Sequence, residues 1–495
     1  MTDKNENKLT SKKSESSENN TDSKYNLIII GGGASGMMAA AVAAAKLADT
    51  NGNKKILIIE HNTELGKKLK ITGGGRCNIL NAEEDAEKLL ANYGKSKKFL
   101  HTTFAEFGMQ DTVDYFKNIG IEIKIEDKKR AFPISEKAVD VYKALESEMY
   151  KYKNKDGPNI VEVMLSTKVL GISTKKIENN KQQVLGVRIL NKSKSKINNE
   201  NKLTKKESGD HAENVSSENE INGEELLVAD KYILATGGMS HAETGSTGDG
   251  FNFLKSLRLK IVEPTPGLTP IKIDSKWVHK LTGKTLKDVK ITFHVDGIKR
   301  KVLNNKNPFD RTLDINILCT HFGMSGPSII NTSKEIREWL NEGEVIMSID
   351  LFKDKDEKEL DEFLLEIFDR NKNRKLRNIL NVIYPQSTLE SIFQYTAELD
   401  KIDLDKDVHS ITKDERKLMV KNLKNLKLKV EGLMGYDKAI IADGGLELSE
   451  VNFKNMSLNL IENLHVTGDI LNISRPSGGY SLQLCWTTGY IAGRA

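Results

Sequence analysis

Three glycines at positions 31, 33 and 36 stand in the order G-x-G-x-x-G, a spacing that can bind the pyrophosphate of a dinucleotide. Gly31 permits a tight turn, Gly33 lets the backbone approach a pyrophosphate, and Gly36 lets a helix pack close to a strand. The N-terminus of the helix that follows offers unpaired N–H groups and a positive dipole end to the phosphates. Ala34 and Ser35 lie within this turn, so we predict that they bind the cofactor as well.

The elements around these glycines have the order that this chemistry requires. The apolar run 25–30 predicts a strand before the turn, and the Ala-rich stretch 37–48 predicts a helix after it. A second apolar strand, 56–59, ends on Glu60, whose carboxylate can accept hydrogen bonds from a ribose hydroxyl. A carboxylate at that place disfavours a 2′-phosphate. The segment therefore predicts a dinucleotide-binding unit of the Rossmann type.

A second glycine-rich segment, TGGGRCN at 72–78, follows LGKK at 65–68. Successive glycines let backbone N–H groups come within bonding distance of a flat ligand. The alternative is a flexible loop without a ligand. On the first interpretation the cofactor-binding residues here are Lys67, Lys68, Gly74, Gly75, Arg76, Cys77 and Asn78.

Two residues are candidates for catalysis. Cys77 is either a redox thiol beside a flavin or a small buried residue, and the lack of a C-x-x-C pair favours burial. His321 stands in the Gly-rich segment HFGMSGP, where it is either a general acid or a structural residue. A lone histidine is more often structural. The sequence has no H-x-x-x-H or C-x-x-C spacing, so we predict no metal site.

The C-terminal part carries features that complement the first turn. Gly468 and Asp469 end the strand-like run LHVTGD, where the glycine permits close approach and the carboxylate can bond a ribityl hydroxyl. Gly478, Gly479 and Tyr480 open a helix predicted over 481–492, whose N-terminus can face the pyrimidine edge of a flavin. Thr236 and Gly237, after the strand 233–235, form either a turn beside the cofactor or a plain strand-end turn. The combination favours FAD over a simple nicotinamide enzyme.

Composition limits the function further. The chain has 495 residues, enough for about three domains, and a net charge of +5, which gives no case for nucleic-acid binding. No apolar run approaches the ~18 residues of a membrane span, and the N-terminus lacks the apolar core of a signal peptide. The cysteines, three in number, predict no disulfide framework and therefore a reducing cytoplasm. The oligomeric state stays open.

The pattern along the chain divides it into units. Residues 1–24 are polar and predict a disordered tail, and 191–224 predict a long polar loop within a hairpin. Apolar runs around Asp296-Gly297 predict a tight β-hairpin over 289–303. The predicted domains are an FAD-binding domain at 25–262 plus 432–495, an inserted β domain at 263–354 and a helical subdomain at 355–431.

The motifs together resemble a bacterial flavoprotein family known from an uncharacterised reading frame of Haemophilus. Its members are labelled NAD(P)/FAD-dependent oxidoreductase or aminoacetone oxidase family FAD-binding enzyme, and a bile-acid-inducible reductase of gut clostridia belongs to the same group. The resemblance rests on IIGGGASGMMAA, LGKKLKITGGGRCNI, CTHFGMSGPSI and SGGYSLQLCWTTGYIAG, and it spreads over 25–495. Members usually carry Asp where this chain has Asn472, and often Ala where it has Cys485.

The resemblance implies an α/β fold in which a Rossmann-like FAD-binding domain, of the two-dinucleotide-binding-domain flavoprotein type, is interrupted by a β-barrel-like domain and a small helical unit. It implies an FAD-dependent oxidoreductase that transfers hydride through flavin N5 to a small-molecule substrate, with reduction of an enone-type C=C bond as one activity. NAD(P)H would be a transient reductant, because no second complete G-x-G-x-x-G follows a strand. The alternative is an FAD-binding protein with a non-redox binding or RNA-associated role.

Overall fold

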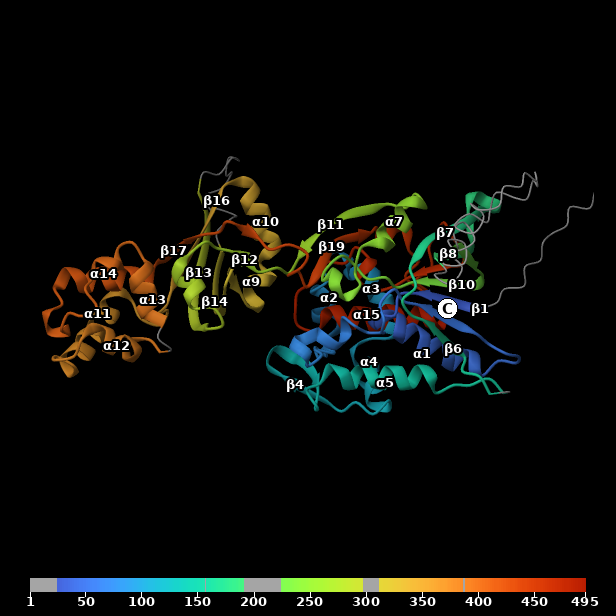
Figure 1. The fold of residues 1–495 in the computed structure, drawn as a ribbon, viewed down its shortest axis with the longest axis horizontal. Coiled ribbons are helices and arrows are strands. Elements are labelled where there is room, and N and C mark those ends of the chain that lie inside the picture. Colours follow the sequence, from blue (N-terminus) through green and yellow to red (C-terminus); the bar gives the residue numbers. More distant parts are fainter. Residues whose placement is uncertain (1–24, 156, 191–223, 297–310, 386–387) are drawn as a thin grey trace, which may run out of the picture.

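The computed structural model describes residues 25–155, 157–190, 224–296, 311–385 and 388–495. Three parts follow one another along the long axis of the molecule (Figure 1). The part that contains both ends of the described chain is built on a parallel sheet, the middle part is an antiparallel sheet, and the far part is helical. The predicted tail at 1–24 lies outside the described residues, as does nearly all of the predicted loop at 191–224.

The parallel sheet has five strands in the order β20-β10-β1-β2-β6. These strands are short and apolar because helices and loops cover both faces of the sheet, as is usual for parallel sheets. The predicted strands at 25–30 and 56–59 are both present, side by side and in parallel register. The strand bounds are β1 Tyr25–Ile30, β2 Ile56–Ile59, β6 Val161–Met164, β10 Ala229–Leu234 and β20 Leu464–Val466.

The C-terminal helix α15 (Tyr480–Arg494) packs directly on the helix α1 (Ala34–Ala48) that follows the glycine turn. Glycines make this contact close. A Cβ at Gly489 would stand 2.5 Å from the carbonyl oxygen of Ser35, and one at Gly493 would stand 2.6 Å from that of Ala39. The first and the last helix of the described residues therefore pack together. Helix α5 (Ala138–Tyr150) packs on α1 as well.

Smaller elements surround this sheet. Three antiparallel sheets have the orders β3-β5-β4, β7-β8-β9 and β11-β19. Their bounds are β3 Leu80–Asn81, β4 Ile123–Glu126, β5 Arg130–Pro133, β7 Val169–Lys176, β8 Gln182–Leu190, β9 Glu224–Leu227, β11 Ile261–Gly267 and β19 Ile441–Leu446. The helices are α2 Ala86–Ala91, α3 Lys97–Glu106, α4 Met109–Asn118 and α7 Asp249–Ser256.

The middle part is a seven-stranded sheet in the order β17-β16-β13-β14-β15-β12-β18. Its two edge strands, β17 and β18, are consecutive in the chain and only two residues apart, so the sheet curls back on itself as a barrel does. The strands are β12 Ile271–Lys272, β13 Thr285–Asp296, β14 Arg311–Thr320, β15 Gly323–Ser325, β16 Glu344–Asp350, β17 Leu426–Lys429 and β18 Gly432–Leu433, with helices α8 Lys276–Lys280, α9 Pro327–Asn331 and α10 Ser333–Glu342.

The hairpin predicted over 289–303 is wrong. A two-residue turn at Asp296-Gly297 would pair β13 with residues close behind the turn, whereas Phe293 pairs with Arg311 and Leu286 with Ile317. β13 thus pairs with β14, described from Arg311 onward, on one side and with β16 on the other, and the predicted returning strand at 298–303 lies outside the described residues. An Asp-Gly pair between apolar runs favours a tight turn locally, but the long-range pairing of the sheet decides the partner.

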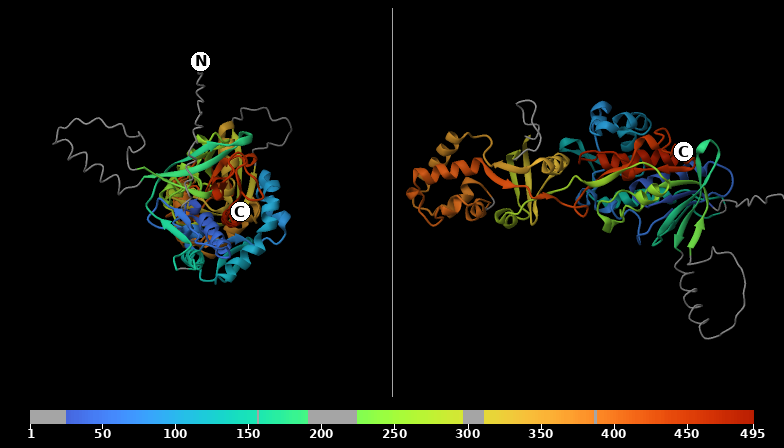
Figure 2. Two further views of the ribbon diagram at one scale, coloured as in Figure 1. Left: turned by 90° about the vertical axis from the view of Figure 1, so that its right-hand side faces the viewer. Right: turned by 90° about the horizontal axis from the view of Figure 1, so that it is seen from above.

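The far part consists of helices α11 (Glu357–Arg370), α12 (Leu376–Ile383), α13 (Thr388–Tyr395) and α14 (Lys413–Lys424). Figure 2 shows these helices at the end of the molecule that is farthest from the parallel sheet. They share one hydrophobic core with the curled sheet, whereas the parallel sheet and its helices form another. The division into domains at the sequence-derived limits stays a prediction. None of the helices in the described ranges is long and apolar enough to cross a membrane.

Candidate functional site

A cavity opens at the carboxyl ends of β1, β2 and β10, and the empty space in it and at its open mouth amounts to about 1230 Å³. This edge of a parallel sheet is where doubly wound folds bind their ligands. The cavity brings together residues from the whole length of the nucleotide-binding part. Ten of the predicted cofactor residues line it: Gly31, Gly33, Ala34, Ser35, Glu60, Lys67, Lys68, Thr236, Gly237 and Asp469.

The glycine turn at the start of α1 has the local geometry that its sequence predicts. Gly31 has φ of 106°, and a Cβ there would stand 2.5 Å from the carbonyl oxygen of Ala235. Gly36 lies against the same turn, and a Cβ there would stand 2.0 Å from the carbonyl oxygen of Gly31. At Gly33, in contrast, a Cβ would meet nothing within 4 Å. Gly33 thus borders open space in the cavity, whereas Gly31 and Gly36 pack against protein.

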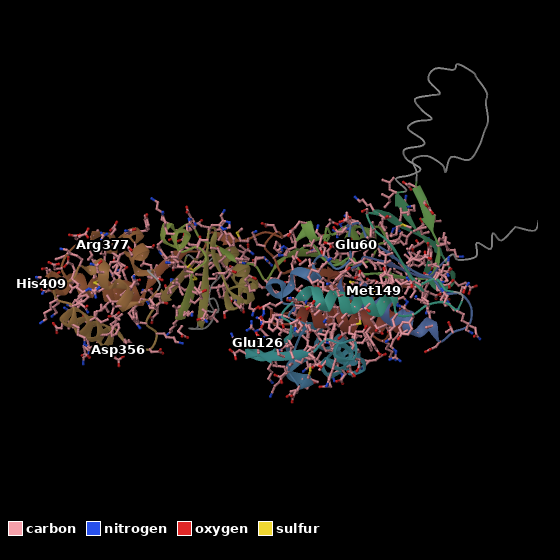
Figure 3. All side chains as sticks on the ribbon, turned by 60° about the horizontal axis from the view of Figure 1, so that its bottom comes forward. Glu60, Glu126, Met149, Asp356, Arg377 and His409 are labelled. Atoms are coloured by element: carbon pink, nitrogen blue, oxygen red, sulfur yellow. The ribbon has the colours of Figure 1, made fainter. Side chains whose placement is uncertain are left out.

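Glu60 is buried at one end of the cavity, with 7 % of its surface exposed. One carboxylate oxygen accepts a hydrogen bond of 2.8 Å from the N–H of Gly32, and the other accepts from the backbone and side-chain nitrogens of Asn62. These bonds hold the carboxylate rigidly beside the glycine turn. Figure 3 labels Glu60 on the part of the molecule built on the parallel sheet.

Lys68 reaches into the cavity from the segment that follows β2. Its ammonium group donates to the carbonyl oxygen of Ser240 at 2.6 Å and to the hydroxyl of Ser240 at 3.1 Å. Burial lowers the pKa of Lys68, and the charge of Asp469 only partly opposes that effect. Its neighbour Lys67 lines the cavity but is exposed. Nearby, the hydroxyl oxygen of Thr236 is buried without a hydrogen-bond partner.

Asp469 lines the same cavity as Lys68 and is bound to Arg475, a residue that the sequence analysis did not single out. The guanidinium of Arg475 also donates to the carbonyl oxygen of Ile473 at 2.7 Å and to the hydroxyl of Ser481 at 3.0 Å. Only 1 % of the Arg475 side chain is exposed. Ser481, from the first turn of α15, lines the cavity with Asp469 and Cys485. Burial raises the pKa of the Cys485 thiol.

The other predicted cofactor residues do not line this cavity. Gly74 and Gly75 are exposed, with φ of 67° and 85°, and only Thr72 of the segment 72–78 reaches the cavity wall. The remaining ones are Gly36, Arg76, Cys77, Asn78, Gly468, Gly478, Gly479 and Tyr480. The role of this second set in cofactor binding stays a prediction.

Arg76 binds protein groups on the small β3-β5-β4 sheet. Its guanidinium donates to the carboxylates of Glu126 and Glu136 and lies 4.1 Å from the centre of the Phe132 ring. Figure 3 shows Glu126 well separated from Glu60. Arg76 is therefore held on the outer side of the glycine-rich segment, facing the small sheet.

Asn78 and Gly479 fasten the glycine-rich segment to the C-terminal helix. With its amide oriented so that both ends are satisfied, Asn78 accepts from the N–H of Gly479 at 3.0 Å and donates to the carbonyl oxygens of Leu80 and Ala131. A Cβ at Gly479 would stand 2.2 Å from the carbonyl carbon of Leu80. Gly478 accepts a hydrogen bond from the side chain of Asn81. This contact region is packed protein.

The two candidates for catalysis lie away from the cavity wall. Cys77 is completely buried, and burial raises the pKa of its thiol to about 12. This placement agrees with the packing role that the sequence favoured. His321 is exposed in the turn between β14 and β15, where its ring meets that of Phe322 edge to face. A metal site is not evident either, since the described residues hold no group of three or more potential ligands.

Several residues of the cavity wall escaped the sequence analysis. Thr167, Lys168 and Val169 lead from β6 into β7, and they reach the cavity only because β6 pairs with β2. Their sequence carries no motif. Arg475 offered a weak signal, because an arginine among serine, proline and glycine residues is easily taken for an exposed turn residue.

The fold and the cavity define the class of the protein. A parallel sheet, a G-x-G-x-x-G turn and a carboxylate at the end of β2 are the features of Rossmann-type dinucleotide binding. The open space at Gly33, the unpartnered hydroxyl of Thr236 and the half-buried ammonium of Lys68 fit a large polar, anionic ligand such as FAD. The chain belongs to the HI0933-like family, because the model of the HI0933-like protein Rossmann domain matches residues 25–189 and 182–495. It is an FAD-dependent oxidoreductase.

Similar proteins include a 3-dehydro-bile acid delta(4,6)-reductase of Clostridium scindens, which is 26% identical over 81% of this chain and 84% of its own length. A ribosomal RNA dihydrouridine synthase of Escherichia coli is 23% identical over 53% of this chain, and the match spans 59% of that enzyme. Among solved structures, a flavocytochrome c3 fumarate reductase is 14% identical, with 95% of this chain and 78% of that chain covered and a TM-score of 0.46.

Proposed function

We propose that FAD binds in an extended form along this cavity, with its adenosine at Glu60 and its pyrophosphate at the turn Gly31–Ser35. The open space at Gly33 and the N-terminus of α1 support the place of the pyrophosphate. The isoalloxazine ring then lies at the other end of the cavity, beside Asp469 and Lys68. The observation that carries the proposal is the single cavity that joins the glycine turn to Lys68, Asp469 and Ser481.

We propose further that the enzyme reduces a C=C bond conjugated to a carbonyl group, with NAD(P)H as reductant. The names of the two curated relatives support this reaction, because a 3-dehydro steroid with such double bonds and the uracil ring both contain a C=C bond next to a carbonyl. When bound, FAD supplies hydride transfer through N5, from NAD(P)H to the carbon farther from the carbonyl, while the nearer carbon takes a proton.

The protein groups of the cavity bind and orient the reactants. Glu60 and the glycine turn hold the adenosine and pyrophosphate, and Lys68, Asp469 and Ser481 hold the far end. Only one complete G-x-G-x-x-G follows a strand, which supports a nicotinamide that binds transiently at the free flavin face. The longer match to the bile acid reductase favours a small-molecule substrate over RNA. The free thiols support action in a reducing compartment, and we propose the cytoplasm.

Anaerobic stopped-flow experiments test this function. The purified protein, loaded with FAD, is mixed with NADH or NADPH, and the reduced enzyme is then mixed with a 3-oxo-Δ4 steroid or with uridine-containing RNA. Reduction by a nicotinamide and reoxidation by the enone are the expected results. If RNA alone reoxidised the enzyme, the substrate would be RNA and not a small enone. FAD that neither nicotinamide reduces would rule out NAD(P)H as the reductant.

A further inference from the structure

Lys68 is a half-buried cation whose hydrogen-bond partners are neutral. Its hydrogen bonds go to the carbonyl and hydroxyl oxygens of Ser240, and the hydroxyl of Ser240 is itself bonded to the carbonyl oxygen of Ile440. No ion pair joins Lys68 to a carboxylate in the described part of the chain. Removing an ammonium group from water without a counter-ion is costly. Because Lys68 borders the cavity, the counter-ion that it lacks can come from the ligand.

The acids nearest to Lys68 are bound to other groups. The carboxylate of Asp469 is held by Arg475, and that of Glu243, which is largely exposed, accepts from His241 at 2.8 Å. Arg475 is almost fully buried and has three protein partners, so it is fixed in place. The guanidinium thereby compensates the charge of Asp469 and leaves the charge of Lys68 uncompensated.

Lys68, Asp469 and the Arg475 that binds Asp469 behind the cavity wall therefore carry together one positive charge in excess, two cations against one carboxylate. The N-terminus of α15 adds to this potential, because Ser481 in its first turn lines the same wall. A flavin ring that is reduced by hydride gains two electrons and one proton and so acquires one negative charge. An excess positive charge beside the ring makes that change more favourable.

We propose that Lys68 is the cation that balances the negative charge of the reduced flavin, and that Arg475 is a positioning residue that keeps Asp469 from neutralising Lys68. This inference rests on the proposed place of FAD in the cavity and is independent of the substrate. If Lys68 served the pyrophosphate, oxidised and reduced FAD would lose affinity equally on its removal. The midpoint potential separates the two roles, because it depends only on the difference between the affinities for oxidised and reduced FAD.

The experiment measures the FAD dissociation constant and the two-electron midpoint potential of Lys68→Met, Lys68→Arg and Lys70→Met in saturating FAD. Lys70 is the matched control, because it lies two residues away, pairs with Glu64 and is outside the cavity wall. In Lys68→Met the preference for reduced over oxidised FAD should fall at least tenfold, which lowers the potential by about 30 mV for two electrons. Lys68→Arg and Lys70→Met should stay near the parent.

Arg475→Met tests the second half of the inference. Asp469, freed from Arg475, should pair with Lys68, and the potential should fall as in Lys68→Met. Adding Asp469→Asn to Arg475→Met restores one excess positive charge, so the potential should return toward the parent. An unchanged potential in Lys68→Met, or loss of both redox forms of FAD from it, would assign Lys68 to the phosphates or to packing and overturn the inference. The proposed reaction would then still stand on the stopped-flow result.

Discussion

The glycine turn at 31–36 and the glycine-rich segment at 72–78 have similar composition and different surroundings. Gly33 borders open cavity, whereas the side chains of Arg76, Cys77 and Asn78 turn toward protein. Both segments use backbone conformations that favour glycine, since Gly31 and Gly74 have φ of 106° and 67°. A glycine-rich sequence thus identifies an unusual backbone path, and the neighbouring strands and helices decide whether that path meets a ligand.

The second segment is nevertheless placed close to the site. Asn78 holds Gly479, and Gly479 precedes the helix turn from which Ser481 and Cys485 reach the cavity. We therefore interpret residues 76–78 as a structural support that holds the start of helix α15 in place; this support is called the brace below. The exposed glycines 73–75 stay candidates for contact with the flavin or the substrate. The following substitutions test whether the first segment binds the ligand and the second supports the structure.

The largest effect is expected for Gly33→Val. A branched side chain there enters the space proposed for the pyrophosphate, and its Cβ meets no protein atom within 4 Å, so FAD binding should weaken by roughly a hundredfold or more, about 3 kcal/mol. Thermal unfolding of the FAD-free protein should be unchanged. Fluorescence titration with FAD and melting of the FAD-free form measure both quantities. Gly36→Val is the contrasting variant. Its Cβ would clash with the carbonyl oxygen of Gly31, so this variant should lower the melting temperature of the FAD-free protein.

The sequence predicted the elements β1, α1 and β2 well, because they and the glycine turn are contiguous and each has a local signal, and Glu60 lines the same cavity as the turn. Long-range pairing decides the rest. The residues 167–169 join the cavity through the pairing of β6 with β2, and β13 takes its partner from residue 311 onward against the local turn signal. Arg475 reaches the cavity wall only through its contacts with Asp469 and Ser481, which no spacing encodes.

The next effect concerns Gly479→Val, where the brace is tested directly. A Cβ at this position stands 2.2 Å from the backbone of Leu80, and φ of 105° is strained for any other residue. We expect a loss of stability of at least about 2 kcal/mol, seen as a lower melting temperature of the FAD-free protein. Wild-type stability with weakened FAD binding would instead place Gly479 at the ligand.

Asn78→Ala should have a moderate effect of the same kind. The substitution leaves the N–H of Gly479 and two carbonyl oxygens without their side-chain partner, which costs about 1–3 kcal/mol of stability. FAD affinity of the folded protein should change less than stability does. Denaturant unfolding and FAD titration on the same preparation make the comparison, with Asn92→Ala, an exposed helix end, as the control. A large loss of FAD affinity at unchanged stability would show that Asn78 contacts FAD and is not mainly structural.

The smallest effect is expected for Cys77→Ser. Cys77 is buried, lies outside the cavity wall, and has a thiol whose pKa burial raises to about 12, which keeps the thiol protonated at neutral pH. A thiol in that state neither attacks a substrate nor donates protons during turnover. The variant should keep its flavin potential and its rate of reduction by NAD(P)H, and native Cys77 should resist alkylation that unfolding makes rapid. Mass spectrometry of alkylated protein and potentiometry check both points. Fast labelling of native Cys77, or a large loss of turnover in Cys77→Ser, would show that the second glycine-rich segment carries chemistry as well as structure.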